Sequence, residues 1–474
     1  MSDLPNYYDL RLDVSRIVPR MTQLATSKRR ARAVREKGRK KNYSQFSLKE
    51  DEWRKQERLL NTEEINSFVE ISIRAAACPM PFNMDIWDGL VCPFACIYCF
   101  ANAFRASLYT AFFDNSKTMG FRHCNPDYYK GELDKMQKLR SYTMDQKREL
   151  TGTNKAFALN IPVRMGIRFE DFLAKEEKEG VSLAMLNYLA DTSYPVMINT
   201  KAALVGSDKY VEALSRNKAK AAVHITAITS NEEITKKLEP GAPSYADRLE
   251  GIRNMVLAGI RVVARIEPFL FLVNDQEDAV NQYMEDMWGA GVRNITFDTY
   301  SYTALNQGIR QSFINNGFDF DRIYMTGCDS QPLGSLLLGS FMQLFRDRGF
   351  SCSTFDMGNA PTNDQAICCE VGDWWPDVGW NYGSTVMAAR YIKRKKGKNV
   401  TWKMYEKYVE TKGGFLSPDL RQDVKELWNL GGNVAYSHRW TQGLKPVGRD
   451  EDGLIWLHDP NDDYRIELLT NITP

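Results

Sequence analysis

The sequence predicts an α/β fold, a partial (β/α)6 TIM-like barrel with a basic N-terminal arm and a small mixed C-terminal appendage. Two observations favour this fold. The chain has 474 residues, of which 43% are hydrophobic and 12% aromatic, so it can bury a large core. Between residues 83 and 299, short β-branched or apolar runs alternate with helix-length amphipathic stretches, which is typical of βα units that build a parallel sheet.

Six strands and the helices between them are expected in this region. The glycines Gly259 and Gly291 directly follow two of the helices, where glycine commonly ends a helix. Ligands bind at the carboxyl ends of the strands in such sheets, so the residues that end each strand are the first candidates for a site. The expected strands are 83–90, 157–165, 195–200, 221–228, 260–268 and 294–299, and the expected helices are 126–140, 182–190, 207–216, 244–258 and 275–290.

The remaining sequence divides the chain into three expected parts. Residues 1–75 form a basic N-terminal arm with a helical extension, and residues 76–302 form the barrel. Residues 303–474 form a C-terminal extension with a helix near 334–346, a region containing Cys and Trp, and a terminal β-hairpin.

Composition excludes several classes of protein. No segment has the roughly 18 apolar residues in a row that a membrane span needs, and the start of the sequence lacks the layout of a signal peptide. The nine cysteines are an odd number spread along a long chain, which favours metal or redox use over a disulfide framework. We therefore expect a cytoplasmic protein with no membrane partner.

The most informative residues are Cys92, Cys96 and Cys99, which form a C-x3-C-x2-C motif directly after the first expected strand. Three thiolates on one short loop suit a cuboidal iron–sulfur cluster, because each can bind a different iron and leave the fourth iron open. An open iron can bind the amino and carboxylate groups of S-adenosylmethionine (SAM), and one-electron reduction then releases a 5′-deoxyadenosyl radical.

Two other interpretations of the motif are open. One is a structural zinc site with Cys78, His123 or Cys124 as fourth ligand, although zinc motifs usually contain two C-x2-C pairs. The other is a set of three buried, inert cysteines.

The motif resembles that of the radical SAM superfamily, because the aromatic Tyr98 precedes the third cysteine and the motif follows the first strand of six expected βα units. Within the superfamily, the sequence is most similar to the spore photoproduct lyase-like group. Further similarities, within residues 83–299, are a strand that ends in Thr200 and Lys201, Glu239-Pro240, Ala242-Pro243 and Arg248.

This resemblance implies roles for single residues. Cys92, Cys96 and Cys99 would ligate a [4Fe–4S] cluster, and an electron donor such as flavodoxin or ferredoxin would reduce it. Residues that would contact SAM are Tyr98 at the adenine, Lys201 at the carboxylate or ribose, His224 or Thr226 on the fourth strand, and Glu170 at the amino group. Without the resemblance, Lys201 reads as a surface charge, and His224 and Thr226 read as half-buried strand residues.

Two departures from the lyase pattern bear on the reaction. Phe100 stands where the lyase pattern has a second aromatic hydroxyl, and a phenyl ring cannot pass a hydrogen atom. The stretch 158–172 contains no cysteine, whereas the lyase has a hydrogen-donating cysteine in this region.

Four cysteines follow the sixth expected strand, namely Cys328, Cys352, Cys368 and Cys369. They are candidates for a second iron–sulfur cluster, although the side chains of adjacent cysteines usually diverge. Buried thiols and a radical-quenching thiol are the alternatives.

Basic and aromatic residues suggest nucleic acid as a partner, most simply DNA. Residues 28–41 contain nine Lys or Arg and one Glu, while the whole chain has a net charge of only +2. The alternatives are a solvated basic face and an aromatic packing seam. The candidate contacts are Arg29, Arg30, Arg32, Lys40 and Lys41 in the basic run, with a second basic cluster at 393–396, and Trp374 and Trp375 in an aromatic run that could stack on bases.

Together these observations predict a radical SAM enzyme of isomerase, lyase or modifying type. The favoured reaction is rearrangement or modification of a thymine-derived base in DNA. The alternatives are a radical SAM enzyme acting on a peptide or small metabolite, lyase-like repair of a DNA photoproduct, and a zinc-stapled nucleic-acid-binding module without enzymatic activity.

Overall fold

The computed structural model describes just over three fifths of the chain. The described residues are 6–16, 62–73, 82–89, 92–99, 121–300, 307–326, 333–354, 399–411 and 444–458, with the single residues 364, 369, 371 and 425.

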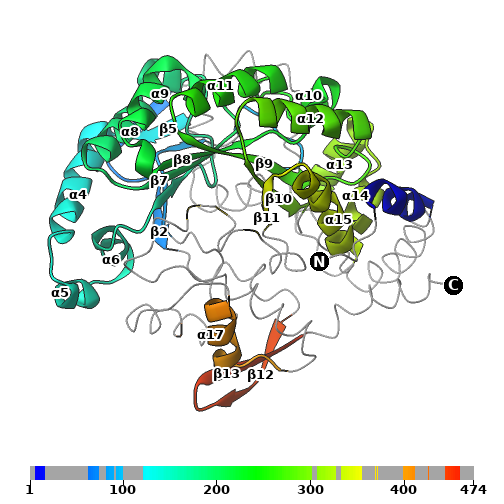
Figure 1. The fold of residues 1–474 in the computed structure, drawn as a ribbon. Coiled ribbons are helices and arrows are strands. Elements are labelled where there is room, and N and C mark those ends of the chain that lie inside the picture. Colours follow the sequence, from blue (N-terminus) through cyan, green and yellow to red (C-terminus); the bar gives the residue numbers. More distant parts are fainter. Residues whose placement is uncertain are drawn as a thin grey trace.

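The main sheet has eight strands in the order β11-β10-β9-β8-β7-β6-β3-β2. All neighbouring strands in it are parallel except β2 and β3, and the seven parallel strands follow one another in sequence order (Figure 1). The strands are β2 (Glu70–Ile73), β3 (Phe82–Asp85), β6 (Val163–Met165), β7 (Val196–Thr200), β8 (Ala221–Thr226), β9 (Arg261–Phe269), β10 (Asn294–Thr299) and β11 (Ser351–Thr354).

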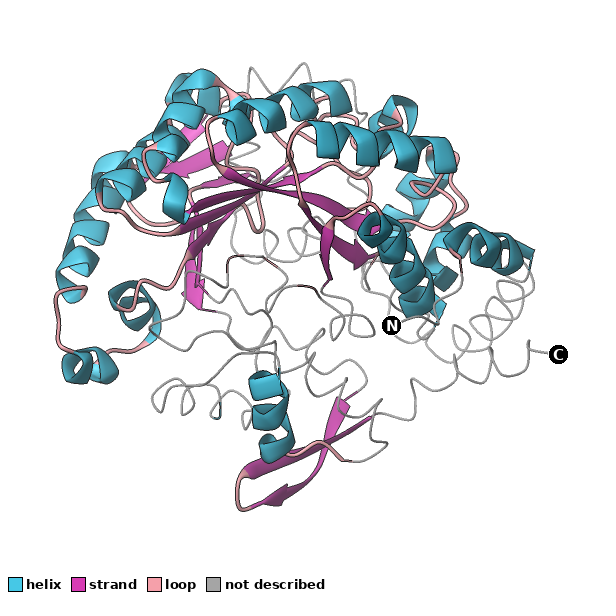
Figure 2. Ribbon diagram, in the orientation of Figure 1, coloured by secondary structure: helices cyan, strands magenta, loops and turns pink. Residues whose placement is uncertain are grey.

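Helices cover the outer face of this curved sheet (Figure 2). Gly259 and Gly291 follow α11 and α12 with φ of +78° and +88°, so both have the helix-ending role that the sequence predicts. The helices are α4 (Pro126–Leu139), α5 (Met144–Glu149), α6 (Gly152–Ala158), α7 (Glu176–Glu179), α8 (Val181–Asp191), α9 (Asp208–Ser215), α10 (Glu232–Leu238), α11 (Tyr245–Leu257), α12 (Glu277–Gly289), α13 (Gln307–Asn315), α14 (Phe320–Thr326), α15 (Leu333–Asp347) and α17 (Trp402–Thr411), with 3-10 turns η1 (Ala203–Gly206) and η2 (Lys218–Lys220).

The second expected strand is partly wrong. Residues 157 and 158 end helix α6, and only Val163–Met165 is a strand. Asn160 has a φ of +56° in the turn between them. The apolar residues of this stretch are buried, and both a strand and a helix can bury such residues. Hydrophobicity alone therefore does not separate a short strand from the end of a buried helix.

The main sheet also takes strands from both sides of the expected barrel, residues 76–302. Strand β2 precedes that range, and β11 follows it and pairs parallel with β10. Strands β2 and β11 are the two edges of the sheet, so within the described residues the sheet is open. The fold is therefore α/β with a mainly parallel sheet, as expected, and it has one more parallel strand than the six predicted.

Smaller elements complete the description. Strands β1 (Thr62–Ile65), β5 (Phe121–Cys124) and β4 (Trp87–Gly89) form a second sheet in the order β1-β5-β4. The expected terminal hairpin is present as the antiparallel strands β12 (Leu444–Asp450) and β13 (Gly453–His458). No helix among the described residues is both long and apolar enough to cross a membrane.

The N-terminal helix spans residues 7–16 and packs against the segment after β9. The buried Tyr7 hydroxyl donates to Asp275 Oδ2 at 2.5 Å, and Arg11 Nε lies 3.0 Å from the same oxygen. The basic run at 28–41 lies outside the described residues, so the arm proper stays a prediction.

The two faces of the main sheet differ in polarity. Ile266 of β9 faces α12 and α15, and Phe297 of β10 packs on Phe345 of α15, so this is the apolar, helix-covered face. Arg265 lies between Ala264 and Ile266 and is in register with Thr226 and Thr296, so these residues share the opposite face. The inner face of the sheet is therefore polar, unlike a simple hydrophobic core.

Candidate functional site

The cysteine motif occupies a loop of tight turns, residues 92–99, that follows β4. Ala95 N donates to Cys92 O at 3.0 Å, and Cys99 N donates to Cys96 O at 3.1 Å. Ala95 has a left-handed backbone with a φ of +48°. Cys96 is buried, whereas Cys92 and Cys99 are partly exposed, so one compact loop carries one buried and two partly exposed cysteines.

The turn after α10 holds the cysteine loop. Ile97 N donates to Leu238 O at 2.9 Å, and Gly241 N donates to Phe94 O at 3.1 Å. A Cβ atom on Gly241 would lie only 2.0 Å from Pro93 O, so the two backbones approach as closely as glycine allows.

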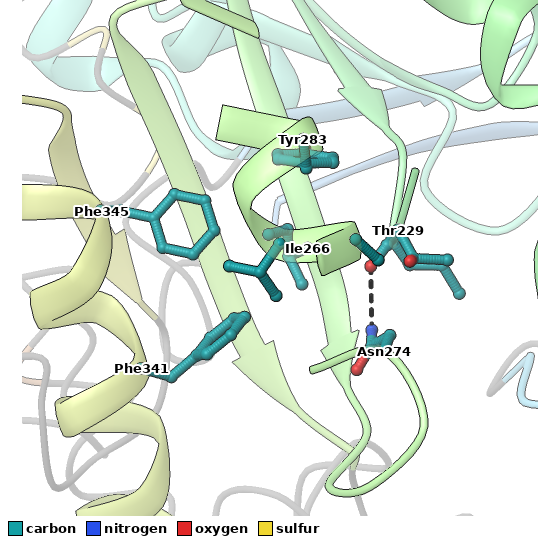
Figure 3. A pocket seen from close by; sticks show the side chains of 9 residues that line it. Thr229, Ile266, Asn274, Tyr283, Phe341 and Phe345 are labelled. Carbon is teal, nitrogen blue, oxygen red and sulfur yellow. Dashed lines mark hydrogen bonds between the residues drawn. The ribbon is translucent and has the colours of Figure 1, made fainter. Parts of the chain in front are cut away.

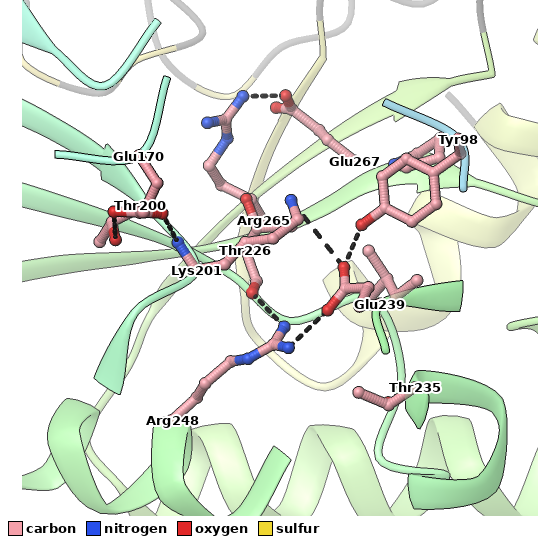
Figure 4. A network of polar contacts seen from close by, with 12 residues as sticks. Tyr98, Glu170, Thr200, Lys201, Thr226, Thr235, Glu239, Arg248, Arg265 and Glu267 are labelled. Carbon is pink, nitrogen blue, oxygen red and sulfur yellow. Dashed lines mark hydrogen bonds and ion pairs between the residues drawn. The ribbon is translucent and has the colours of Figure 1, made fainter. Parts of the chain in front are cut away.

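A network of polar side chains lies beside this loop (Figure 4). The buried carboxylate of Glu239 accepts a hydrogen bond from the Tyr98 hydroxyl. The same carboxylate lies 3.8 Å from Lys201 Nζ and 2.5 Å from Arg248 Nη2. Lys201 Nζ also lies 5.4 Å from the centre of the Tyr98 ring. Tyr98 and Lys201, which the resemblance assigns to SAM, are therefore neighbours.

The charges of this network shift the pKa values of its residues. Burial by itself would raise the pKa of Glu239, but the charges of Arg248 and Lys201 outweigh it and hold the pKa below its usual value. Burial, together with the Glu239 charge, raises the pKa of Tyr98, so the phenol is a hydrogen-bond donor. Burial also raises the pKa of the Cys96 thiol, and the Lys201 charge partly offsets this effect.

Glu170 links the end of β7 to the loop after β6. Its carboxylate is buried and accepts hydrogen bonds from Thr200 Oγ1 at 2.6 Å, Phe172 N at 3.1 Å and Lys201 N at 3.0 Å. Burial raises its pKa despite these donors. Glu170 thus fixes the strand end that carries Lys201, and its contact with the amino group of SAM stays a prediction.

His224 and Thr226 lie on the polar inner face of β8, and both side chains are buried. His224 Nε2 lies 3.0 Å from Cys369 O. Burial, followed by the charge of Arg265, lowers the pKa of His224 to about 3, so the imidazole is neutral at ordinary pH. Thr226 is also tied to the network, because its carbonyl accepts a hydrogen bond from Arg248 Nη1 at 2.8 Å.

Several charged residues of this region had no role predicted from the sequence. Arg265 and Glu267 form an ion pair on β9, and Arg164 of β6 donates two hydrogen bonds to Asn83 Oδ1 of β3 at 2.9 and 3.1 Å. One signal was available, because charged residues interrupt the otherwise apolar strand Arg261–Phe269. For Glu239, the only signal in the sequence was its place in the segment that resembles the lyase-like group.

The cysteine loop supplies suitable ligands for a [4Fe–4S] cluster. The three sulfurs come from one short loop, and a cuboidal cluster needs each of them at a different iron and not all at one ion. Among the described residues, no three His, Cys, Asp or Glu side chains are arranged to hold one metal ion.

The alternative zinc ligands on β5 have other contacts. The ring of His123 lies 4.9 Å from that of Trp87, and Cys124 Sγ lies 2.8 Å from Ser67 O. Cys78 lies outside the described residues.

The described cysteines of the second group lie on different faces of the sheet. Cys352 Sγ lies 3.7 Å from Met342 O of α15, on the helix-covered face, whereas Cys369 contacts His224 on the inner face. These two residues therefore give no support to one shared second cluster. Several other predicted residues lie outside the described ranges, namely Cys328, Cys368, Trp374, Trp375, Arg29, Arg30, Arg32, Lys40 and Lys41.

A small gap with no room for a water molecule lies between the sheet and helices α12 and α15 (Figure 3). Ile266, Phe341 and Phe345 line it, and Asn274 Nδ2 donates to Ile228 O at 3.0 Å beside it. This space is on the helix-covered face and is separate from the cysteine loop.

Comparison with known proteins gives similar structures only. No family model matches the chain, and no curated protein matches it. A spore photoproduct lyase variant with bound AdoMet and dinucleoside spore photoproduct is 13% identical, with a TM-score of 0.45 over 67% of this chain and 87% of that chain. SuiB from Streptococcus suis, bound to its precursor peptide SuiA, is 11% identical, with a TM-score of 0.37 over 83% of this chain and 76% of that chain.

A third similar structure is the radical S-adenosylmethionine methyltransferase TsrM from Kitasatospora setae, with cobalamin and a [4Fe–4S] cluster bound. It is 10% identical, with a TM-score of 0.28 over 55% of this chain and 37% of that chain. All three similarities are distant, with sequence identities of 10–13% and TM-scores below 0.5. We base the function on the residues of this chain.

Proposed function

We propose that this protein is a radical SAM enzyme whose [4Fe–4S] cluster is held by Cys92, Cys96 and Cys99. The observation that carries the proposal is the position of the cysteine loop, whose Tyr98 ring lies 5.4 Å from Lys201 Nζ at the carboxyl end of β7. When bound, the cluster and SAM supply a 5′-deoxyadenosyl radical that abstracts hydrogen from an unactivated carbon.

The residues around the loop have binding and orienting roles in this proposal. The Lys201 ammonium offers a charge to the carboxylate of SAM, and the Tyr98 ring offers a flat surface to the adenine. Glu170 holds the backbone of Lys201, and the neutral His224 presents an uncharged imidazole on the inner face.

For the substrate, we propose a thymine-derived base in DNA that is rearranged or modified. The basic run at 28–41 supports a polyanionic partner, and the resemblance to the lyase-like group supports thymine chemistry. The absence of a cysteine from 158–172 and the presence of Phe100 favour a reaction other than photoproduct cleavage. A flavodoxin or ferredoxin is the proposed electron donor.

The experiment is 5′-deoxyadenosine release from SAM by protein reconstituted with iron and sulfide without oxygen and then reduced, with and without thymine-containing DNA. The triple alanine variant of Cys92, Cys96 and Cys99 is the control for the cluster. Release that DNA stimulates supports both the enzyme class and the substrate. If DNA leaves the release unchanged and a peptide or metabolite increases it, the DNA proposal alone is overturned. No release, with cluster and SAM both bound, overturns the enzyme class.

A further inference from the structure

Glu239 is a buried carboxylate that joins three separate parts of the fold. Its side chain is fully buried, directly after helix α10. Tyr98 comes from the cysteine loop, Lys201 from the end of β7, and Arg248 from helix α11 (Figure 4). A buried charge is costly unless it is paired, so this arrangement is stable only with its partners in place.

The two cations of this network are held differently. Arg248 is fixed by the backbone, because its Nε and Nη2 donate to Pro243 O at 3.0 and 2.7 Å and its Nη1 donates to Thr226 O at 2.8 Å. Lys201 Nζ is 3.8 Å from Glu239 Oε1, which is an ion pair longer than a hydrogen bond. Arg248 therefore anchors the carboxylate, and the carboxylate holds the Lys201 ammonium by charge.

The backbone around Glu239 contacts the same loop. Leu238 O and Gly241 N are hydrogen-bonded to the backbone of Ile97 and Phe94, on either side of Cys96. The Tyr98 side chain adds a third attachment, from the residue before Cys99. One turn of chain thus holds the cysteine loop by two backbone bonds and one buried side-chain bond.

We propose that Glu239 is a positioning residue that fixes the cysteine loop through Tyr98 and holds the Lys201 ammonium beside it. The consequence for the bound cluster rests on the function proposed above, whereas the positioning of the loop itself does not. Glu239 also sets the local charge, because one carboxylate offsets one of the two neighbouring cations.

The first test uses the reduced protein without a cluster. The alkylation rates of Cys92, Cys96 and Cys99 by iodoacetamide are measured by mass spectrometry in the wild type and in Glu239→Gln. We expect alkylation of Cys96 and Cys99 to be about tenfold faster in the variant, because a buried hydrogen bond to a charged group is weakened. Buried Cys352, on the far face of the sheet, is the internal reference for general unfolding.

The matched control is Glu267→Gln. Glu267 is also a carboxylate paired with an arginine, Arg265, and both residues lie on strand β9. Its substitution leaves a cation without its partner, as Glu239→Gln does, and is expected to leave loop alkylation unchanged. Equal alkylation in the wild type and Glu239→Gln, or equal acceleration in both variants, overturns the proposal.

Tyr98→Phe tests the proposal if Glu239→Gln does not fold. It removes only the hydroxyl that donates to Glu239, and the Glu239–Arg248 pair remains. We expect faster alkylation of Cys96 and Cys99 in this variant, without a change at Cys352. Tyr7→Phe is its control, because it removes another buried hydroxyl that donates to a carboxylate, at Asp275. No acceleration in Tyr98→Phe overturns the proposal.

The second test uses the reconstituted protein and measures the midpoint potential of the cluster. Removal of the Glu239 charge leaves Lys201 and Arg248 in excess, which favours the reduced, more negative cluster, so Glu239→Gln is expected to raise the potential. Glu239→Asp keeps the charge and is expected to restore the potential. A potential that is the same in Glu239→Gln and the wild type overturns the electrostatic part.

The two proposals fail in different ways. If the wild type binds no cluster but the alkylation results are as expected, the enzyme class fails and the positioning role stands. If the cluster forms and 5′-deoxyadenosine is released, but alkylation and potential are unaffected by Glu239→Gln, the enzyme class stands and the positioning role fails.

Discussion

His224 Nε2 lies 3.0 Å from the carbonyl oxygen of Cys369, across 145 residues of sequence. This contact joins the inner face of β8 to a segment that follows β11. It explains how the buried imidazole is satisfied while remaining uncharged, because a neutral imidazole with a proton on Nε2 donates to this carbonyl.

The first prediction follows from this burial. The pKa of His224 is about 3 in the folded protein and about 6.5 in the unfolded chain, so the unfolded state binds more protons between these values. The wild type is therefore expected to lose stability as the pH falls below about 6.5, by up to about 1.4 kcal/mol per pH unit from this group. Urea unfolding from pH 4 to 8, compared with His224→Asn, measures it. A difference between the two proteins that does not vary with pH would contradict the burial of an uncharged histidine.

The second prediction concerns Gly241. Its substitution by Ala places a methyl group 2.0 Å from Pro93 O, so the cysteine loop must move away from its support. We expect a loss of about 1–3 kcal/mol in unfolding free energy, as for other overpacked sites, and reduced iron binding on reconstitution.

Gly131→Ala is the matched control for this substitution. Gly131 lies within helix α4, and an added Cβ there meets nothing within 4 Å. This variant is expected to be more stable than the wild type by about 0.5–1 kcal/mol, because alanine is the better helix former. Equal effects at the two positions, measured by denaturant unfolding, would mean that Gly241 is not in tight contact with the loop.

The third prediction concerns Asp171, which joins the strand before the cysteine loop to the loop after β6. Its carboxyl oxygens accept hydrogen bonds from Trp87 N at 3.1 Å, Ile86 N at 3.3 Å and Gly166 N at 3.0 Å. In Asp171→Asn, one of these N–H groups would face the amide nitrogen. We expect a loss of about 1–3 kcal/mol, measured by denaturant unfolding near pH 5.

The same carboxyl gives a pH dependence of opposite sign to that of His224. Burial raises the pKa of Asp171, and the charge of neighbouring Asp85 adds to the effect. The folded state therefore binds protons more tightly, so this contribution to stability is present at low pH and is lost as the pH rises through the folded pKa. The cost of Asp171→Asn is expected to decrease as the pH rises. A cost that increases with pH would show that the carboxylate is preferentially ionised.

The fourth prediction concerns the docking of the N-terminal helix. Tyr7→Phe removes the buried hydroxyl that donates to Asp275, while Arg11 still pairs with that carboxylate. The expected loss is about 1.5 kcal/mol in unfolding free energy, near the low end for a hydrogen bond to a charged group. Tyr283→Phe is the control, because the buried Tyr283 hydroxyl has no hydrogen-bond partner among the described residues. A similar loss in both variants would assign the effect to the ring and not to the bond.

Much of the fold was predictable because its signals are local. Strands such as β8 and β10 are short apolar runs, and a helix that ends at a glycine lies before or after each of them. Their observed bounds agree with the expected ones within a few residues. The short polar strand β11 was missed, since Ser351–Thr354 acquires its role only by pairing with β10.

For the site, the cysteine motif could be identified from sequence because its three residues lie within eight positions of one loop. The contact between Tyr98 and Glu239 could not be identified from sequence. The two residues are 141 positions apart, and a spacing of this length carries no information about contact. The register of β8 on β9 brings Thr226 beside Arg265, and the fold buries Glu239 between Arg248 and Lys201. Burial and long-range pairing set the charges of these groups, and both arise only when the strands assemble into the sheet.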